Sequence, residues 1–241
     1  PRDETAVRAV DPAAVGQTDI TAVAATGDGS VFERVASGAL ETRTPTVRVE
    51  LGGVGGRAVA DVDASISGYA PEMACYNCLR ERIAAGEPDT DGGDCDDSTA
   101  RLAGAIAGKE LTALIEDDQS RLLGGVIELP YTQRRLLPVP HCACERGDVA
   151  DTQLRRTSED RPLEESITMA EVAFDERVGP IASVGEVESF PVPYYLATLS
   201  GTPFSDAAAP DHAAGVGLDW DPAFMKALGE ALERYAAGVY R

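Results

Sequence analysis

The residues with the clearest chemistry are four cysteines arranged as two close pairs. Cys75 and Cys78 form a CxxC motif, and Cys142 and Cys144 form a CxC motif, with 63 residues between Cys78 and Cys142. Zn²⁺ in a structural site takes four thiolate or imidazole ligands in a tetrahedron and leaves no position open. Because each motif can present two thiolates on one side of the chain, the pattern predicts one structural zinc site that ties a late hairpin to an earlier turn. A redox-active CxxC and buried free thiols stay open as alternatives, although the redox interpretation gives the CxC pair no role.

Two residues close to these motifs are predicted to have other roles. Cys95 lies in an acidic, glycine-rich stretch (86–98), where we expect a free thiol on a surface loop. His141 precedes Cys142 and carries a nitrogen that zinc also accepts. With four thiolates available, we expect His141 to pack or to form a hydrogen bond instead.

A pair of carboxylates near the end of the chain is the second candidate site. Glu230 and Glu233 are three residues apart, so on a helix they share one face. Such a pair suits coordination of Mg²⁺ beside nucleotide phosphates. The alternative is a solvated helix face with Arg234 and Lys226 as neighbours, and from the residues alone this alternative is favoured because acidic faces are frequent in this chain.

The elements that position these residues alternate between strand-like and helix-like segments. Apolar spacing predicts strands at Thr5–Val10, Ile20–Ala25, Thr46–Leu51, 124–130 and 134–139, and helices at Ser30–Leu40, after the CxxC motif, at Ala100–Ile115 and at Pro222–Tyr240. This order predicts an α/β fold with a small parallel sheet, followed by an α+β segment. The charged residues 148–165 are predicted to be a linker between a zinc-binding domain (1–147) and a second region (166–241).

The glycine cluster Gly52–Gly56 permits two interpretations. A phosphate-binding loop should lead directly into a helix. Here a strand-like stretch (57–63) follows, so a tight hairpin turn is the preferred interpretation.

The charge balance of the chain restricts its partners. There are 41 acidic and 21 basic residues, which gives a net charge of −20, and the acidic residues are scattered along the chain. This charge disfavours duplex nucleic acid and anionic membranes as binding partners. Because the acidic residues are scattered and there are only two lysines, adaptation of the protein to high salt is favoured over binding of a cationic partner. The sequence contains no membrane-spanning segment and no signal peptide, so we expect a cytoplasmic protein, and we expect both ends to be cut from a longer protein.

The second region resembles the start of a YcaO domain, the ATP-dependent enzyme of thiazole and oxazole peptide maturation. The resemblance covers about 70 residues and rests on Asp175, Val178–Ile181, the glycines Gly215 and Gly217, and the helix segment Ala227–Tyr235. It implies that Glu230 and Glu233 help to bind Mg²⁺ and ATP, and that Arg234 lies near the phosphates or braces the glutamates. It also implies that Gly215 and Gly217 belong to the nucleotide-binding turn.

One position departs from the pattern of that family. Many members carry a lysine between the two glycines, where this chain has Val216, and Lys226 or an arginine would have to supply the missing charge. Further glutamate and glutamine positions of the family would lie beyond Arg241, so we expect the fragment alone to be inactive. His212 precedes the glycines and is predicted to have a capping or surface role.

Residues 5–145 are similar to the ThiF-like partner domain of YcaO enzymes, through the cysteine pattern and the strand order. The resemblance implies a zinc-stabilised scaffold that presents a ribosomally made precursor peptide and does not itself adenylate. Together the two resemblances imply an enzyme that forms thiazoline or oxazoline rings by ATP-dependent cyclodehydration. A non-catalytic peptide-docking module, a thioamide-forming accessory protein and a homodimer stay open.

Overall fold

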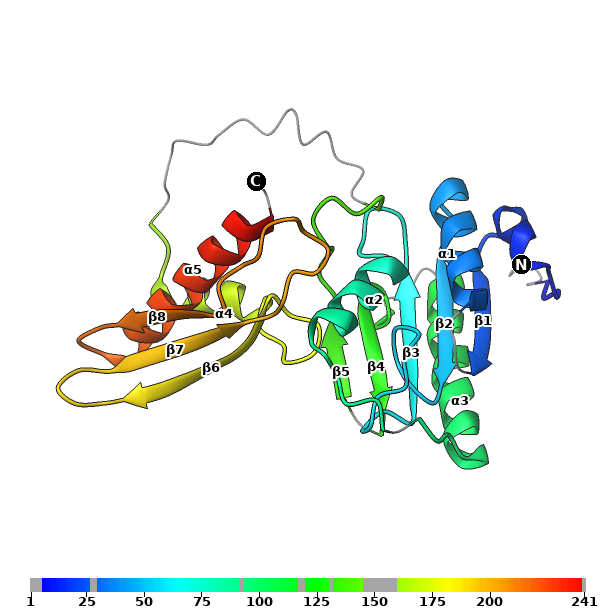
Figure 1. The fold of residues 1–241 in the computed structure, drawn as a ribbon. Helices are drawn as coiled ribbons and strands as arrows, with labels where there is room; N and C mark the ends of the chain where they lie inside the picture. Colours follow the sequence, from blue (N-terminus) through cyan, green and yellow to red (C-terminus); the bar gives the residue numbers. More distant parts are fainter. Residues whose placement is uncertain are drawn as a thin grey trace.

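The structure is a computed structural model that describes residues 6–26, 30–91, 93–116, 120–130, 132–144 and 160–239. These residues form two separate sheets, a five-stranded sheet in the order β1-β2-β3-β4-β5 and a three-stranded sheet in the order β6-β7-β8 (Figure 1). Each sheet has helices packed against it, so the expected mixed α/β class is confirmed.

The five-stranded sheet begins with a β-α-β unit. Its strands are β1 (Thr21–Thr26), β2 (Thr46–Leu51), β3 (Ala64–Tyr69), β4 (Gly125–Leu129) and β5 (Thr132–Arg135). Helix α1 (Ser30–Thr42) connects β1 to β2, and these two strands are parallel, as expected. The pairs β2–β3, β3–β4 and β4–β5 are antiparallel, so the expected parallel sheet is limited to its first two strands.

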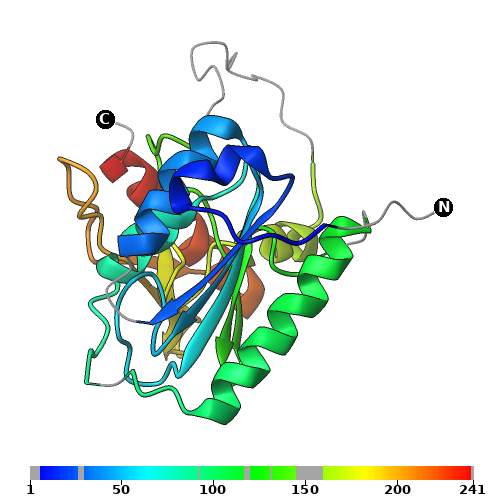
Figure 2. The same ribbon diagram turned by 90° about the vertical axis from the view of Figure 1, so that its right-hand side faces the viewer.

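Helices cover both faces of this sheet. Helix α1 and helix α2 (Tyr76–Ala85) lie on one face, and the long helix α3 (Asp97–Ile115) lies on the other (Figure 2). Strand β2 is therefore buried on both sides: Val47 and Val49 face α3, whereas Thr46, Arg48 and Glu50 alternate with them and point toward α1 and α2. Polar side chains thus lie inside the protein on the face that also carries the cysteines.

The three-stranded sheet is antiparallel throughout and has its own core. It consists of β6 (Ile181–Glu188), β7 (Tyr194–Leu199) and β8 (His212–Val216). The final helix α5 (Trp220–Val239) packs on it through small and apolar side chains, and α4 (Leu163–Glu171) packs beside α5.

Arginine side chains join the two halves. Arg134 on β5 contacts Glu128, Asp175 and Glu176 at 2.8, 3.0 and 3.2 Å, and Arg177 contacts Asp61 at 2.7 Å. Asp175 and Arg177 lie in the segment that leads into β6, so these ion pairs hold the second sheet against the edge of the first.

Three local expectations differ from the structure. Residues 6–10 form no regular structure, so the strand expected at Thr5–Val10 is absent in the described part of that segment; a short 3-10 helix (Pro12–Gln17) lies between it and β1. Most of the expected linker 148–165 lies outside the described residues, and its last residues, Leu163–Glu165, form the first turn of α4. The expected turn at Gly52–Gly56 is present with four glycines at positive φ, but the next strand begins later, at Ala64.

None of the helices in the described part of the chain combines the length and the apolar character needed to cross a bilayer.

Candidate functional site

The four cysteines of the two motifs meet at one point of the first half. Their Sγ atoms lie within 4.8 Å of one another, with 3.9 Å between Cys75 and Cys78, 3.6 Å between Cys75 and Cys142, and 3.4 Å between Cys78 and Cys144. A tetrahedral Zn²⁺ with Zn–S bonds of about 2.3 Å places its sulfurs roughly 3.8 Å apart. The four thiols therefore have the spacing of a closed metal centre.

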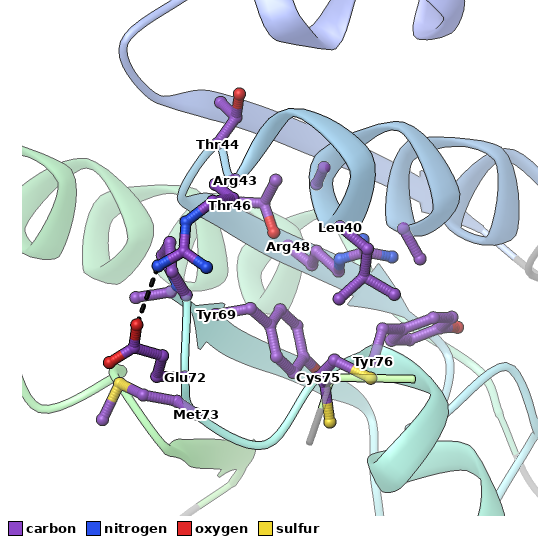
Figure 3. Close-up of a pocket in the computed structure, with 15 residues that line it drawn as sticks. Leu40, Arg43, Thr44, Thr46, Arg48, Tyr69, Glu72, Met73, Cys75 and Tyr76 are labelled. Atoms are coloured by element: carbon purple, nitrogen blue, oxygen red, sulfur yellow. Dashed lines mark hydrogen bonds and ion pairs between the residues drawn. The ribbon is translucent and has the colours of Figure 1, made fainter. Parts of the chain in front are cut away.

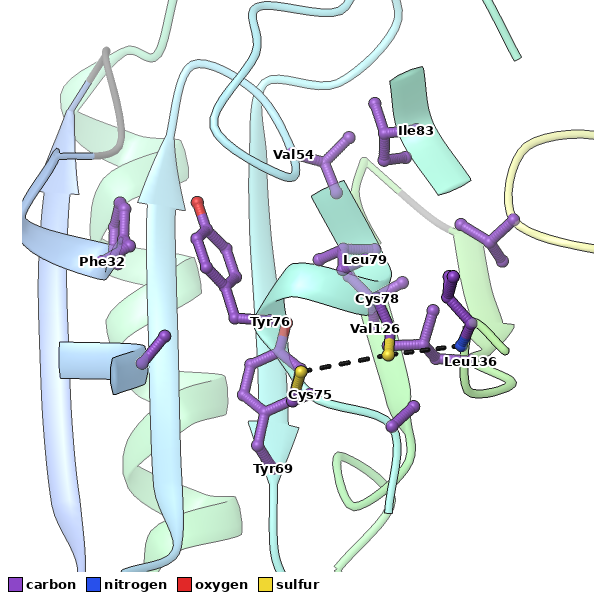
Figure 4. Close-up of a cluster of buried hydrophobic side chains, with 14 of the residues drawn as sticks. Phe32, Val54, Tyr69, Cys75, Tyr76, Cys78, Leu79, Ile83, Val126 and Leu136 are labelled. Atoms are coloured by element: carbon purple, nitrogen blue, oxygen red, sulfur yellow. Dashed lines mark hydrogen bonds between the residues drawn. The ribbon is translucent and has the colours of Figure 1, made fainter. Parts of the chain in front are cut away.

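Local structure explains why the thiols converge. Cys75 is the N-cap residue of α2 and Cys78 lies in its first turn, where both point into the hydrophobic cluster between α2 and the sheet (Figure 4). Cys142 and Cys144 arrive on the segment after β5. Arg82 of α2 holds that segment, because its Nε donates to Leu137 O at 2.7 Å and its Nη2 donates to Pro138 O at 2.8 Å.

Hydrogen bonds among the thiols give them very different acidities. The contact with Cys142 raises the pKa of Cys75, but contacts with Cys144 and Cys78 lower it by more, so that it lies at about 7. Contacts with Cys142 and Cys144 raise the pKa of Cys78 far above its usual range. Without a cation the four thiols therefore do not ionise together. A bound metal ion stabilises all four thiolates, and an all-sulfur donor set fits a borderline-soft ion such as Zn²⁺.

The remaining cysteine and the neighbouring histidine lie outside this group. Cys95 lies in the loop before α3, where its Sγ contacts Asp96 O at 3.6 Å. His141 Nε2 lies 3.2 Å from the carbonyl oxygen of Val239, so this side chain makes a hydrogen bond to the end of α5.

The carboxylates of the second candidate site lie on helix α5. Glu233 is exposed, and Glu230 is partly exposed and accepts a hydrogen bond of 2.6 Å from Arg234 Nε. Arg234 and Glu230 are thus joined by an ion pair on one face of α5. Lys226 lies one turn before Glu230, and its Nζ donates to Val216 O at 2.9 Å. The ammonium of Lys226 therefore lies against the backbone at Val216.

The two glycines beside Val216 bring β8 into close contact with α5. A Cβ atom at Gly215 would lie 2.2 Å from Ala223 O, and one at Gly217 would lie 2.8 Å from Ala223 N. Gly215 belongs to strand β8 and not to a turn, and only Gly217 follows the strand. His212 is exposed at the opposite end of β8.

Sequence reasoning missed the burial of three arginines, Arg48, Arg82 and Arg134. Arg134 is 6% exposed and makes the contacts to Glu128, Asp175 and Glu176 described above. Asp175 also accepts hydrogen bonds from the backbone nitrogens of Arg177 and Val178, so this residue of the YcaO pattern fixes the turn before β6. Arg48 is 1% exposed, and in the sequence it looks like an ordinary charged residue of an alternating strand.

Comparison with known proteins gives a likeness of fold. No family model matches the sequence, and no curated protein matches it. Among solved structures, a heterocyclase in complex with substrate and cofactor superposes with a TM-score of 0.63 at 13% sequence identity, over 93% of this chain and 40% of that chain. The chain therefore has the fold of part of a heterocyclase and spans less than half the length of that protein.

Two further structures match less well. They are E. coli MccB with MccA-N7isoASN (TM-score 0.40, 16% identity, 58% of this chain and 45% of that chain) and the heterocyclase TruD (TM-score 0.43, 17% identity, 70% of this chain and 30% of that chain). Their TM-scores are too low to indicate a shared fold, so we draw nothing from them.

Proposed function

We propose that this chain is part of an ATP-dependent peptide cyclodehydratase of the YcaO type. The observation that carries the proposal is the extent of the fold likeness: one heterocyclase matches 93% of the chain, across both sheets. The motifs of the second region that resemble the YcaO pattern add support, because Asp175, Glu230 and Glu233 all lie in the half that contains β6, β7, β8 and α5.

In this proposal the two halves have different tasks. Residues 1–147 form a ThiF-like scaffold that positions a precursor peptide, residues 148–165 connect it, and residues 166–241 open the YcaO domain. The centre formed by Cys75, Cys78, Cys142 and Cys144 holds a structural Zn²⁺. This Zn²⁺ would stabilise the fold of the first half and would take no part in catalysis, because a closed tetrahedral centre leaves no coordination position for a substrate.

The face of α5 that carries Glu230 and Glu233 would bind Mg²⁺ and ATP. The carboxylates of Glu233, which is exposed, and Glu230, which is partly exposed, fit the oxygen ligands that Mg²⁺ prefers, and Mg²⁺ would supply charge neutralisation at the phosphates. Arg234 holds the Glu230 carboxylate in place through its 2.6 Å hydrogen bond. Lys226, which contacts Val216 O, would supply the positive charge that the family pattern places between the glycines.

The proposed reaction converts a peptide amide and ATP into an azoline ring, ADP and inorganic phosphate. A Cys, Ser or Thr side chain of the substrate attacks the carbonyl carbon of the preceding amide, and the former carbonyl oxygen leaves as phosphate. The side-chain proton and the amide proton are also lost, so the peptide loses the elements of one water for each ring. This chemistry requires positioning and charge stabilisation and needs no nucleophile from the protein.

The proposal is tested by ATP hydrolysis in the full-length protein that contains this chain. Glu230→Gln should abolish Mg²⁺-dependent turnover and leave the unfolding transition in place, because an exposed carboxylate contributes little to stability. Glu164→Gln, an exposed change on α4, is the matched control and should leave turnover unchanged.

Other outcomes would favour the alternatives. Bound zinc with no ATP binding would favour a non-catalytic peptide-docking module. ATP turnover that requires external sulfide and no Cys, Ser or Thr in the peptide would favour thioamide formation.

A further inference from the structure

Arg48 is a buried cation whose position the proposed function does not explain. It lies on β2 with only 1% of its surface exposed, and its Nη1 donates to Phe32 O at 2.6 Å. The centre of its guanidinium lies 4.3 Å from the ring centroid of Tyr76 and 5.2 Å from that of Tyr69. The two rings offer cation–π contacts, but they do not neutralise its charge.

No carboxylate in the described part of the chain forms an ion pair with Arg48. Glu50, two residues along the strand, accepts hydrogen bonds from Gly56 N and Tyr76 OH instead. Phe32 O is the only acceptor that the guanidinium reaches among the described residues, and Nε is buried without a hydrogen-bond partner. Nε therefore has an unused hydrogen to donate, and the edge of a guanidinium that contains Nε and Nη2 can bind a carboxylate through two parallel hydrogen bonds.

Burial lowers the pKa of Arg48, and the nearby Glu50 and Cys75 oppose that shift, so they offset part of its charge without accepting a hydrogen bond from it. The unused Nε donor of this buried charge needs an explanation.

A cavity of about 40 Å³ lies beside Arg48 (Figure 3). Thr46, whose Oγ1 is also buried without a hydrogen-bond partner, lines it, and its apolar walls include Ala39, Leu40 and Met73. This space exceeds what one water molecule needs. The cavity thus combines two unpaired polar groups with an apolar surround, as ligand sites do.

The mouth of the cavity is formed by an ion pair with an unusual backbone. Arg43 Nη2 lies 2.9 Å from Glu72 Oε1 (Figure 3). Both residues have positive φ, 58° for Arg43 and 67° for Glu72, a conformation that costs a non-glycine residue about 1 kcal/mol or more. The positive φ of Arg43 belongs to the end of α1, where Thr44 N donates to Ala39 O at 3.1 Å, so the entrance is defined by the ion pair between Arg43 and Glu72 and not by backbone strain.

We propose that this cavity binds a monocarboxylate with a short apolar body, whose carboxylate pairs with Arg48 and Thr46. The ligand is either a small free acid or the carboxylate at the end of a peptide chain. The site lies on the first half and uses no residue of α5, and its lining includes Cys75 and Cys144, so it borders the four-cysteine centre and is separate from the proposed ATP-binding residues.

The binding test uses isobutyrate, its neutral amide isobutyramide, and N-acetylvaline, each titrated into the zinc-loaded chain by ligand-observed NMR at constant ionic strength. Isobutyrate should bind saturably in the millimolar range, and isobutyramide should bind at least about tenfold more weakly because it lacks the charge. Tighter binding of N-acetylvaline than of isobutyrate would identify a peptide terminus as the source, and the reverse order would identify a small acid.

Variants at the mouth separate a binding role from a structural one. Arg43→Gln leaves Glu72 unpaired beside the entrance and should weaken isobutyrate binding about fivefold, whereas Glu72→Gln should strengthen it by a similar factor. Ala39→Leu fills the cavity on a helix that tolerates leucine and should abolish binding while the fold is retained.

Equal binding of isobutyrate and isobutyramide, or unchanged binding in Ala39→Leu, would overturn the proposal. Absence of isobutyrate binding would overturn it as well, and loss of zinc in Arg48→Met would then indicate a different role for the guanidinium. Arg48 would then be the counter-charge of the four-cysteine centre, whose four thiolates and one Zn²⁺ leave an excess of negative charge.

Discussion

Replacing Arg134 by methionine should lower the free energy of unfolding, because it removes the ion pairs that join the two halves of the protein. The guanidinium of Arg134 is buried and contacts Glu128 from its own hairpin and Asp175 and Glu176 from the segment before β6. Methionine keeps much of the volume and removes the charge. Glu128, which is 3% exposed, would then have Arg177 Nε at 3.5 Å as its one cationic neighbour among the described residues.

The magnitude follows from the burial of the pair. Removing one partner of a buried ion pair costs about 3–5 kcal/mol of unfolding free energy, because a buried charge is left uncompensated. Arg177 remains near Glu128, and the contact with the exposed Glu176 contributes little, so we expect a loss of about 3 kcal/mol. Arg135→Met, the adjacent exposed position on β5, is the matched control and should stay within about 0.5 kcal/mol of the parent protein.

The loss should also depend on pH in a defined direction. Burial raises the pKa of Glu128, although Arg134 opposes the shift, and removal of Arg134 raises it further. A carboxylate with a raised pKa in the folded state destabilises the protein at high pH. The penalty shrinks as the pH falls through the folded pKa and disappears below the unfolded value of about 4.3. The difference between Arg134→Met and the parent protein should therefore decrease from pH 7 toward pH 4.

Urea unfolding followed by two signals is the assay. The single tryptophan, Trp220, reports on the half that contains α5, and zinc release reports on the other half. Glu128→Leu added to Arg134→Met should recover much of the loss, because replacing both charges with apolar groups avoids the unpaired carboxylate. The reasoning is refuted if Arg134→Met is as stable as Arg135→Met, or if the double variant is no better than the single one.

Three further predictions concern the metal centre and the contact between α5 and β8. Cys75→Ser should release zinc and lower the melting temperature of the first half, and retained metal with unchanged melting would contradict the four-thiolate centre. Arg82→Met should weaken zinc binding about tenfold in a chelator competition, because Arg82 holds the segment that brings Cys142 to the centre; an unchanged affinity would show that this support is unnecessary. Gly215→Ala should cost about 2 kcal/mol or more in denaturant unfolding because its Cβ would lie 2.2 Å from a backbone oxygen, whereas Gly229→Ala, which has open space on α5, should stabilise by up to about 1 kcal/mol; similar effects at both positions would refute the close packing.

The sequence predicted the elements with strong local signals. Apolar spacing and capping residues predicted three helices: α2 after the CxxC motif, α3, which ends at Ile115 as expected, and the final helix α5. The paired spacing of the four cysteines predicted that they converge. The hairpin expected at Gly52–Gly56 implied an antiparallel partner for β2, but the start of β3 at Ala64 and its pairing with β4 were not predicted, because contacts between distant segments leave no local pattern.

The buried arginines were missed for a related reason. Arg48 and Arg134 look like ordinary charged residues of alternating strands, and only the folded chain places both under covered faces. The same limit applies to Gly215, which the family pattern assigns to a nucleotide turn and the structure places in a strand packed against α5.

The central claim, an ATP-dependent cyclodehydratase, is tested most directly by isothermal titration of Mg²⁺-ATP into the full-length protein, with Glu230→Gln/Glu233→Gln measured in parallel. We predict saturable binding that requires Mg²⁺ and that the double variant loses. Binding that is absent in the parent protein, or that is unchanged in the double variant, would contradict the proposed function of α5.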